Sequence, residues 1–305
     1  MAMNIRESRS RFRSSPKRDQ GVVNAMEDIM SASPTMGQTA YRHSLLCHLH
    51  FPRSRPNGDV SVFSRTSGRA TLSLLSLDQG SEASIPLPFG SMARALVTHL
   101  GTLAVRTQSP LIDVGPSARC FLGAMGKRSS GGQNGSLTSL REQMAALSNC
   151  SLALQMDKTE PRSACISRVL EPLYRQNNGP TNSEKWQRYI RLGQPFFESL
   201  LLHAVPLDMR ALAALSDYPL AYDVYTWLAE RLHRTKGTQF IPWCEIHRQF
   251  GTERTGKHAR RDMVTDFQRA LFYALSVYPA AKVRAVDGGV ALYRSPPPVP
   301  YRGDA

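Results

Sequence analysis

Apolar and polar positions follow the most regular pattern in the last part of the chain, from about residue 217 to residue 294. Apolar side chains recur at helical spacing over residues 219–232 and 257–277, and a short amphipathic segment begins at residue 241 between them. Two short extended runs, 282–286 and 290–293, flank the turn sequence Asp287-Gly288-Gly289 and predict a hairpin. Helix, short helix, basic loop, long helix and hairpin is the order of a winged helix-turn-helix, a fold whose recognition helix enters the DNA major groove.

The middle of the chain predicts a similar order. Residues 61–65 and 70–77 alternate with period two around a turn and indicate a hairpin. A helix over 89–105, a short extended piece at 110–114 and a short helix at 117–125 follow. After a Gly/Ser-rich loop at 127–135, Ser136 is expected to cap a helix over 137–148, and a strand follows at 151–156. We therefore expect an α+β fold of two tandem winged helix-turn-helix domains, although their sequences do not align closely as a repeat.

The remaining segments set the expected domain boundaries. Residues 1–40 are rich in Arg and Ser and low in aromatics, which predicts a disordered basic arm, either touching phosphates or merely solvated. The N-terminal winged-helix domain should cover 41–190, with a polar insertion at 157–190. The C-terminal one should cover 191–295, with a strand at 195–203, and residues 296–305 form a Pro-rich tail.

Composition narrows the possible partners. The formal net charge is +14 and the isoelectric point is about 10.0, so a polyanion such as nucleic acid or an anionic membrane is favoured. No run of about 18 apolar residues predicts a membrane span. The five cysteines are dispersed without zinc-ligand spacing, as expected for core residues in a reducing cytoplasm. No G-x-x-x-x-G-K-[ST] phosphate loop occurs, and we expect no cofactor.

Cations and polar side chains gather where each domain would meet DNA. Arginine suits guanine, because its paired donors match two acceptors on the base edge, and Lys or Arg suits phosphate. A solvated basic face is the alternative for the same residues. The C-terminal candidates are Arg254, Lys257, His258, Arg260 and Arg261 at the last long helix, and Arg284 in the wing. The N-terminal candidates are Lys127, Arg128, Gln133, Asn134, Ser136, Thr138, Ser139 and Arg141.

One short pattern favours an enzyme instead. His48-Leu49-His50 would place two histidines on one face of a strand, as in metal-dependent enzymes that nick DNA with a tyrosine. No matching acid and tyrosine pair appears at a convincing spacing, so we expect no catalysis. A transcriptional repressor without a replication role is the third alternative, and origin repeats beside the gene would distinguish it.

Several blocks in order resemble one protein family. Ser216-Asp217-Tyr218-Pro219-Leu220-Ala221-Tyr222-Asp223, then Ile241-Pro242-Trp243, and upstream Pro88-Phe89-Gly90, resemble plasmid-encoded RepA-type replication initiators. The resemblance covers roughly residues 41–298. It departs from the family at Gln133-Asn134, where an Arg-Trp pair is usual.

The resemblance implies a function that composition alone does not. Such initiators bind repeated origin sequences (iterons) in double-stranded DNA, help to open the adjacent AT-rich duplex and recruit host replication proteins, including the host initiator and helicase. They commonly bind the repeats as monomers and repress their own promoter as homodimers. Related initiators consist of two winged-helix domains. The expected location is the bacterial cytoplasm, without a membrane partner.

Overall fold

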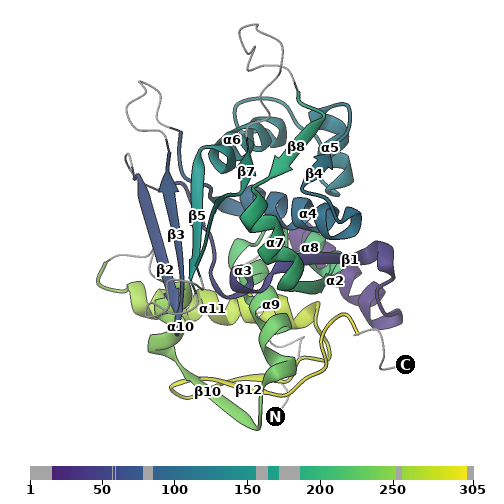
Figure 1. The fold of residues 1–305 in the computed structure, drawn as a ribbon. Helices are drawn as coiled ribbons and strands as arrows, with labels where there is room; N and C mark the ends of the chain where they lie inside the picture. Colours follow the sequence, from purple (N-terminus) through teal and green to yellow (C-terminus); the bar gives the residue numbers. More distant parts are fainter. Residues whose placement is uncertain are drawn as a thin grey trace, which may run out of the picture. The chain divides into compact units, whose positions relative to one another are not determined.

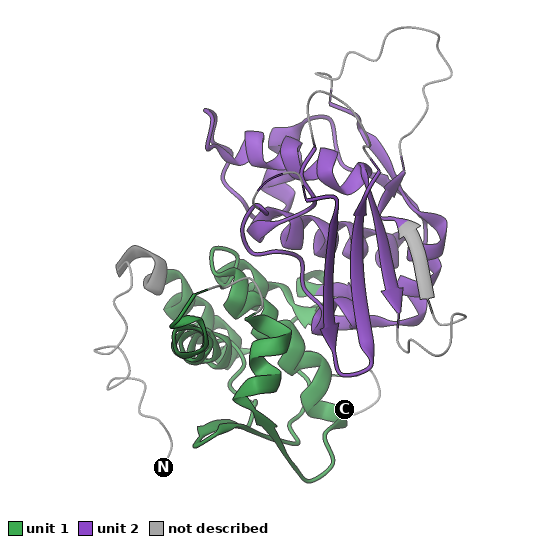
Figure 2. Ribbon diagram, turned by 90° about the vertical axis from the view of Figure 1, so that its left-hand side faces the viewer, with its two compact units in different colours: residues 1–39, 207–305 green, residues 40–206 purple. Residues whose placement is uncertain are grey.

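The computed structural model describes residues 16–56, 58, 60–77, 85–155, 164–171, 186–251 and 256–300 (Figure 1). The chain divides into two compact units, coloured separately in Figure 2. Unit 2 is the continuous stretch 40–206, whereas unit 1 joins residues 1–39 to residues 207–305. This division differs from the expected boundaries, because the N-terminal segment belongs to the C-terminal unit and residues 191–206 belong to the unit before it.

Unit 1 contains most of the expected C-terminal elements. Its helices are α8 (Met209–Ala214), α9 (Pro219–Arg231), a short 3-10 turn η3 (Leu232–Arg234), α10 (Trp243–Phe250) and α11 (Ala259–Ser276). Its strands are β10 (Thr238–Pro242), β11 (Val283–Val286) and β12 (Gly289–Tyr293). They form an antiparallel sheet in the order β10-β12-β11.

Aromatic side chains hold the three long elements of unit 1 together. The rings of Trp227 on α9, Phe250 on α10 and Phe267 on α11 lie 5.3–6.3 Å apart between centroids. All three are essentially inaccessible to solvent. Such large apolar side chains each stabilise the fold by roughly 1.5–3 kcal/mol on burial, so this cluster fixes how α10 and α11 cross.

Residues 16–31 are helical, which corrects the expected disorder of this part of the N-terminal arm. Helix α2 (Pro16–Ser31) packs against α8 and α11, and a short 3-10 turn η1 (Met36–Gln38) follows. Val22, Met26 and Ile29 recur at helical spacing, and Val22 is 3% exposed. The segment has few apolar residues, and a helix of this kind is stable only when its one apolar stripe is covered by other elements.

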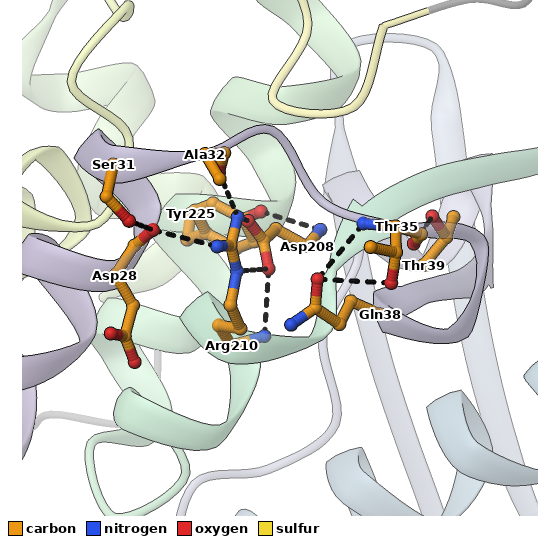
Figure 3. A network of polar contacts seen from close by, with 9 residues as sticks. All are labelled: Asp28, Ser31, Ala32, Thr35, Gln38, Thr39, Asp208, Arg210 and Tyr225. Carbon is orange, nitrogen blue, oxygen red and sulfur yellow. Dashed lines mark hydrogen bonds and ion pairs between the residues drawn. The ribbon is translucent and has the colours of Figure 1, made fainter.

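An arginine of α8 caps the end of α2. The guanidinium of Arg210 donates hydrogen bonds to the carbonyl oxygens of Asp28 and Ala32, at 2.9 and 3.0 Å (Figure 3). The last carbonyls of a helix have no partner within the helix, so a cationic donor at this end is doubly favourable. Residues 207–210 and the N-terminal helix therefore belong to one folded body.

Unit 2 contains two sheets and five helices among the residues that the structure describes. The helices are α3 (Ser44–His48), α4 (Gly90–Thr107), α5 (Ala118–Ala124), α6 (Ser136–Ser148) and α7 (Gln194–Leu202). Strands β2 (Val62–Ser67), β3 (Ala70–Ser76), β5 (Cys150–Gln155) and β6 (Ala164–Arg168) form a four-stranded antiparallel sheet. Strands β4 (Leu111–Asp113), β8 (Tyr189–Leu192) and β7 (Leu170–Glu171) form a second one in that order.

The chain passes between the units in two short strands. Strand β1 (Thr39–His43) pairs with β9 (Ala204–Asp208) in a two-stranded sheet. Within unit 2, the Nδ1 atom of His43 accepts a hydrogen bond from the Leu45 amide and caps α3. Two fully buried guanidiniums, of Arg42 and Arg94, donate mainly to carbonyl oxygens, including those of Leu46 and Phe51, and fix the segments around α3.

Both units share one order of elements. In unit 2 the order is α4, β4, α5, α6, β7 and β8, and in unit 1 it is α9, β10, α10, α11, β11 and β12. In each unit the strand after the first helix pairs antiparallel with the last strand, which pairs antiparallel with the strand between them. Unit 2 differs because β5 and β6 are inserted between α6 and β7 and join the β2-β3 hairpin.

Three further expectations are corrected. Residues 195–203, expected as a strand, lie almost entirely in α7, with Phe196, Phe197 and Leu200 buried on one side. The stretch 157–190 is more than a polar insertion, because its described parts include β6, β7 and the start of β8; residues 157–163 and 172–185 lie outside the described residues. The Pro-rich tail starts inside the fold, since Val299 is buried and the Tyr278 hydroxyl donates to the Pro296 carbonyl at 2.6 Å.

Candidate nucleic-acid interface

Helices α10 and α11 of unit 1 meet at a glycine that no other residue could replace without movement. A Cβ atom added to Gly251 would lie 2.7 Å from Met263 Cγ on α11 and 2.9 Å from the His247 carbonyl oxygen. The Gly251 amide donates to that same carbonyl at 2.7 Å and closes α10. The close approach of Gly251 to Met263 fixes how α10 and α11 pack against each other.

The cations expected at the start of α11 are exposed. Lys257 and His258 directly precede the helix, which begins at Ala259, and Arg260 and Arg261 occupy its first turn. Arg254 lies outside the described residues. Arg261 Nε is 3.8 Å from the Asp262 carboxylate, with side chains 78% and 45% exposed, so this pair is weak and leaves the guanidinium accessible.

The outer face of α11 adds two residues that sequence analysis missed. Arg261, Thr265 and Gln268 follow at intervals of four and three residues and therefore share one face, opposite buried Met263 and Phe267. Thr265 is exposed, and its hydroxyl donates to the Arg261 carbonyl at 3.3 Å. Gln268 is half-buried, and glutamine suits adenine. The helical period itself could have identified both residues.

The hairpin after α11 is held against α10. Asp287 and Gly288 form the turn between β11 and β12, and the Gly288 carbonyl accepts a hydrogen bond from the Trp243 amide at 3.0 Å. Arg284 lies on β11, opposite Ala291 of β12, and is exposed. Arg284, the expected wing residue, is thus accessible, and the two strands of the hairpin are joined by a two-residue turn.

In unit 2 the Gly/Ser-rich loop before α6 is folded on itself. The Ser136 hydroxyl accepts from the Ser130 amide at 2.8 Å and donates to the Arg128 carbonyl at 2.9 Å. The Thr138 hydroxyl donates to the Gly132 carbonyl at 2.8 Å. A Cβ at Gly135 would lie 2.4 Å from the Gly131 carbonyl oxygen, so only glycine allows this closure. Gly135, rather than the expected Ser136, is the N-cap of α6.

The loop leaves the remaining candidates at the surface. Arg128, Gln133, Asn134, Thr138 and Arg141 are exposed, whereas Lys127, Ser136 and Ser139 are half-buried. The opposite side of α6 is buried through Leu140, Gln143 and Leu147. Since the Gln143 side chain accepts from the Phe89 amide at 2.9 Å, α6 is anchored to the start of α4. The loop and the outer face of α6 therefore occupy the position in unit 2 that Gly251 and α11 occupy in unit 1.

A further cation, Arg188, lies beside the β4-β8-β7 sheet of unit 2. Arg188, just before β8, donates to both carboxylate oxygens of Asp113 on β4, with the shortest contact at 2.8 Å. This guanidinium holds the pKa of the Asp113 carboxyl below its usual value. Trp186 anchors the same segment, because its indole donates to the Gly115 carbonyl at 2.8 Å and its ring packs on Phe121 of α5.

The histidine pattern that favoured a nicking enzyme does not form the expected strand. His48 is the last residue of α3, and His50 lies fully buried two residues later. Burial, followed by the charges of Arg65, Arg94 and Arg42, lowers the pKa of His50 well below its ordinary value. Within the described ranges, no three His, Cys, Asp or Glu side chains are grouped to hold a metal ion.

No helix in the described part of the chain is long and apolar enough to span a bilayer. A model of the plasmid-encoded RepA protein family matches residues 88–244, from just before α4 to the first two residues of α10. No curated protein sequence matches the chain. A crystal structure of domains 2 and 3 of RctB is similar at 16% sequence identity, with 81% of this chain and 94% of that chain covered and a TM-score of 0.44.

Proposed function

Because this chain belongs to the family of plasmid-encoded RepA proteins, we propose that it is a plasmid replication initiator that binds repeated origin sequences in double-stranded DNA. Binding at the repeats would promote opening of the adjacent duplex, and binding at its own promoter would repress transcription. We propose this DNA-binding role without a catalytic step and without a cofactor. Host replication proteins would join at the opened origin in the bacterial cytoplasm.

The observation that carries this proposal is the shared order of elements in the two units. Each has a helix, a strand, two helices and two further strands, in a sheet where the last strand lies between the other two. We infer that both units are winged helix-turn-helix domains, with α11 and α6 as their recognition helices. In such domains the N-terminal residues of the recognition helix contact base edges, while neighbouring cations contact phosphates.

The chemistry of the exposed residues supports this assignment. Arg260, Arg261 and Gln268 offer the donor and acceptor groups that discriminate guanine and adenine in the major groove. Lys257 and His258 precede the helix and suit phosphate contacts. In unit 2, Gln133, Asn134, Thr138 and Arg141 offer the same combination. We propose that Ser136 positions the loop rather than contacting DNA, since its hydroxyl already bonds the Ser130 amide, the Ser130 hydroxyl and the Arg128 carbonyl.

A gel shift with duplex DNA from either side of the gene, in excess competitor DNA and Mg²⁺, tests the proposal. We expect a ladder of specific complexes on fragments with direct repeats, and intact DNA after protein removal. A single complex on the promoter alone, with none on repeats, would favour a plain repressor. Nicked DNA bound covalently to the protein would reveal an enzyme and contradict the proposal.

A mutation pair refines this test. Arg261→Ala removes an exposed cation from the outer face of α11, whereas Lys236→Ala removes one from the loop that precedes β10. Lys236 precedes Thr238, the first residue of β10, whereas α10 begins directly after Pro242 at the other end of the strand. Only the first variant should lose affinity for the repeats.

A further inference from the structure

The three-stranded sheet of unit 1 has one face that does not belong to its core. Phe240 of β10 lies opposite Ala291 of β12, which lies opposite Arg284 of β11. Directly opposed residues of antiparallel strands project from the same face, so these three form one row across the sheet. The neighbouring positions Ile241, Val290 and Leu292 alternate to the other face and are buried in the core.

The outer face combines aromatic, aliphatic and basic side chains. The Phe240 side chain is 53% exposed and Val286 is 39% exposed, although burying either would stabilise the fold. Tyr293 projects from the same face and is half-buried, and Lys282 and Arg284 are exposed at its edge. Residues 238–242, 282–286 and 289–293, all of them described, contain no Asp or Glu. Ala291 in the middle strand is only 6% exposed, so Phe240 and Val286 supply the accessible apolar surface of this face. Lys282 and Arg284 supply its positive charge, and Asp287 lies in the adjoining turn.

The position of the Phe240 ring is determined by two glycines. A Cβ at Gly289 would lie 2.9 Å from two ring atoms of Phe240, and one at Gly288 would lie 3.7 Å from the ring. The ring thus rests on the glycine turn of the hairpin, which fixes its position. An aromatic ring that is fixed on one side and open on the other is a ready surface for stacking.

We propose that this face binds single-stranded DNA, with an unpaired base stacked on Phe240 and phosphates contacted by Arg284 and Lys282. An aromatic platform beside cations on an open sheet is the general chemistry of single-strand recognition, since every base has a flat face and every nucleotide a charge. Arg284 lies two strand spacings from Phe240, roughly 9–10 Å, which its long side chain can span. Tyr293 lies diagonally at about 7–8 Å, within reach of the next base.

Double-stranded DNA fits this face less well. Bases in a duplex are stacked on each other, so a ring on a flat sheet reaches them only after the strands have separated. This inference rests on the proposed function, because origin opening would supply the single-stranded DNA. The assignment of α11 to duplex and of the sheet face to single strand gives unit 1 two separate nucleic-acid surfaces.

Fluorescence anisotropy of the full-length chain with a labelled oligo(dT) of about 15 nucleotides, the upper range of one single-strand binding site, tests this assignment. Phe240→Ala should weaken binding roughly ten-fold, whereas Phe240→Trp, which keeps a stacking ring, should bind as tightly as the unchanged protein. Arg284→Ala should weaken binding and lower its salt dependence. The matched control is Leu202→Ala, which removes a side chain that is 80% exposed on α7 of unit 2.

The outcomes separate this inference from the proposed function. Loss of oligo(dT) binding in Phe240→Ala, with unchanged binding to duplex repeats, supports the single-strand site. Unchanged oligo(dT) binding in that variant, or no binding by the unchanged protein, overturns it, as does equal loss of single-strand and duplex binding. If Phe240→Ala instead loses only association with another protein, the face is a protein contact and the inference is wrong. Single-strand binding without duplex binding would leave this site standing and contradict the origin-binding role.

Discussion

Arg210 and Asp208 form an ion pair of 2.8 Å at the point where the N-terminal helix joins the C-terminal unit. Both side chains are largely buried, with 14% of Arg210 and 2% of Asp208 exposed. The hydrogen bond from Arg210 to Asp208 raises the pKa of the Arg210 guanidinium. The same guanidinium donates to the carbonyl oxygens of Asp28, in the last turn of α2, and of Ala32, just after the helix. Because α2 also packs on α11, this pair connects the start of the chain to the candidate recognition helix.

Arg210→Ala should release α2 from unit 1. The substitution removes charged-donor hydrogen bonds to the Asp28 carbonyl of α2 and to the Ala32 carbonyl just after it, each worth about 1.5–3 kcal/mol. It also leaves the Asp208 carboxylate without its cation. We expect amide hydrogen exchange over residues 21–31 to become much faster. Ser31→Ala is the control, since it removes only an exposed bond to the Asp28 carbonyl. Equal protection of α2 in Arg210→Ala would show that the apolar stripe alone holds the helix.

Gly251→Ala should disturb the crossing of α10 and α11. The added methyl group would overlap Met263 and the His247 carbonyl, and overpacking of this kind costs about 1–3 kcal/mol. Both the melting temperature and the affinity for duplex repeats should fall. Gly123→Ala, in α5 with no atom within 4 Å of the added Cβ, should be neutral or slightly stabilising. A Gly251→Ala protein with unchanged stability would mean that the two helices adjust freely.

Ser136→Ala should loosen the loop of unit 2 without unfolding it. The three exposed hydrogen bonds of its hydroxyl are each worth about 0.5–1.5 kcal/mol. If the loop must be ordered before it meets DNA, affinity for the repeats should fall about ten-fold while the melting temperature changes little. Ser148→Ala, which removes a bond to the Met144 carbonyl at the other end of α6, should bind DNA normally. Unaltered binding by Ser136→Ala would place the loop away from the DNA.

His99 should make unit 2 sensitive to acid. Burial, and then the charge of Arg106, lower the pKa of His99 from 6.5 to about 4. The unfolded chain therefore takes up this proton first as pH falls, and the free energy of unfolding decreases between pH 6.5 and about 4. Within that window the loss is about 1.4 kcal/mol per pH unit, and above it His99 contributes no pH dependence.

His99→Leu should flatten this part of the pH profile in urea denaturation. The Nε2 atom of His99 is buried without a hydrogen-bond partner among the described residues, so leucine also removes a polar group at little cost. Replacement of exposed His258 by Gln is the control and should leave the slope as it was. An identical slope in His99→Leu would show that the side chain is hydrated in solution.

The sequence predicted those elements whose apolar positions have a clear period and whose ends have turn residues. Helices α4, α6, α9 and α11 and the β11-β12 hairpin are of this kind. Segment 195–203 was misassigned because a short continuous run of apolar residues shows no alternation with polar residues, so its pattern fits a strand and a helix equally well. Strand β10 was missed because Thr238 to Pro242 gains its conformation from pairing with β12.

The sequence identified the charged residues of the candidate site, but it did not show which uncharged residues share a surface with them. Arg260 and Arg261 stood out by charge, and the structure leaves both exposed. Thr265 and Gln268 carry no charge and become candidates only when they share a face with Arg261. The contribution of α2 depends on the hydrogen bond from Arg210 to Asp28, which are 182 residues apart, and no local pattern encodes such a contact.

The most direct test of the account is the salt dependence of binding to duplex repeats, measured for the unchanged protein and for Arg260→Ala combined with Arg261→Ala. Affinity should fall, and the slope of log K against log salt should become shallower by about 0.9 for each phosphate that the variant no longer neutralises. Lys236→Ala should leave both quantities nearly unchanged. An unaltered affinity and slope in the double variant, with the fold intact by circular dichroism, would contradict the assignment of α11 as the recognition helix.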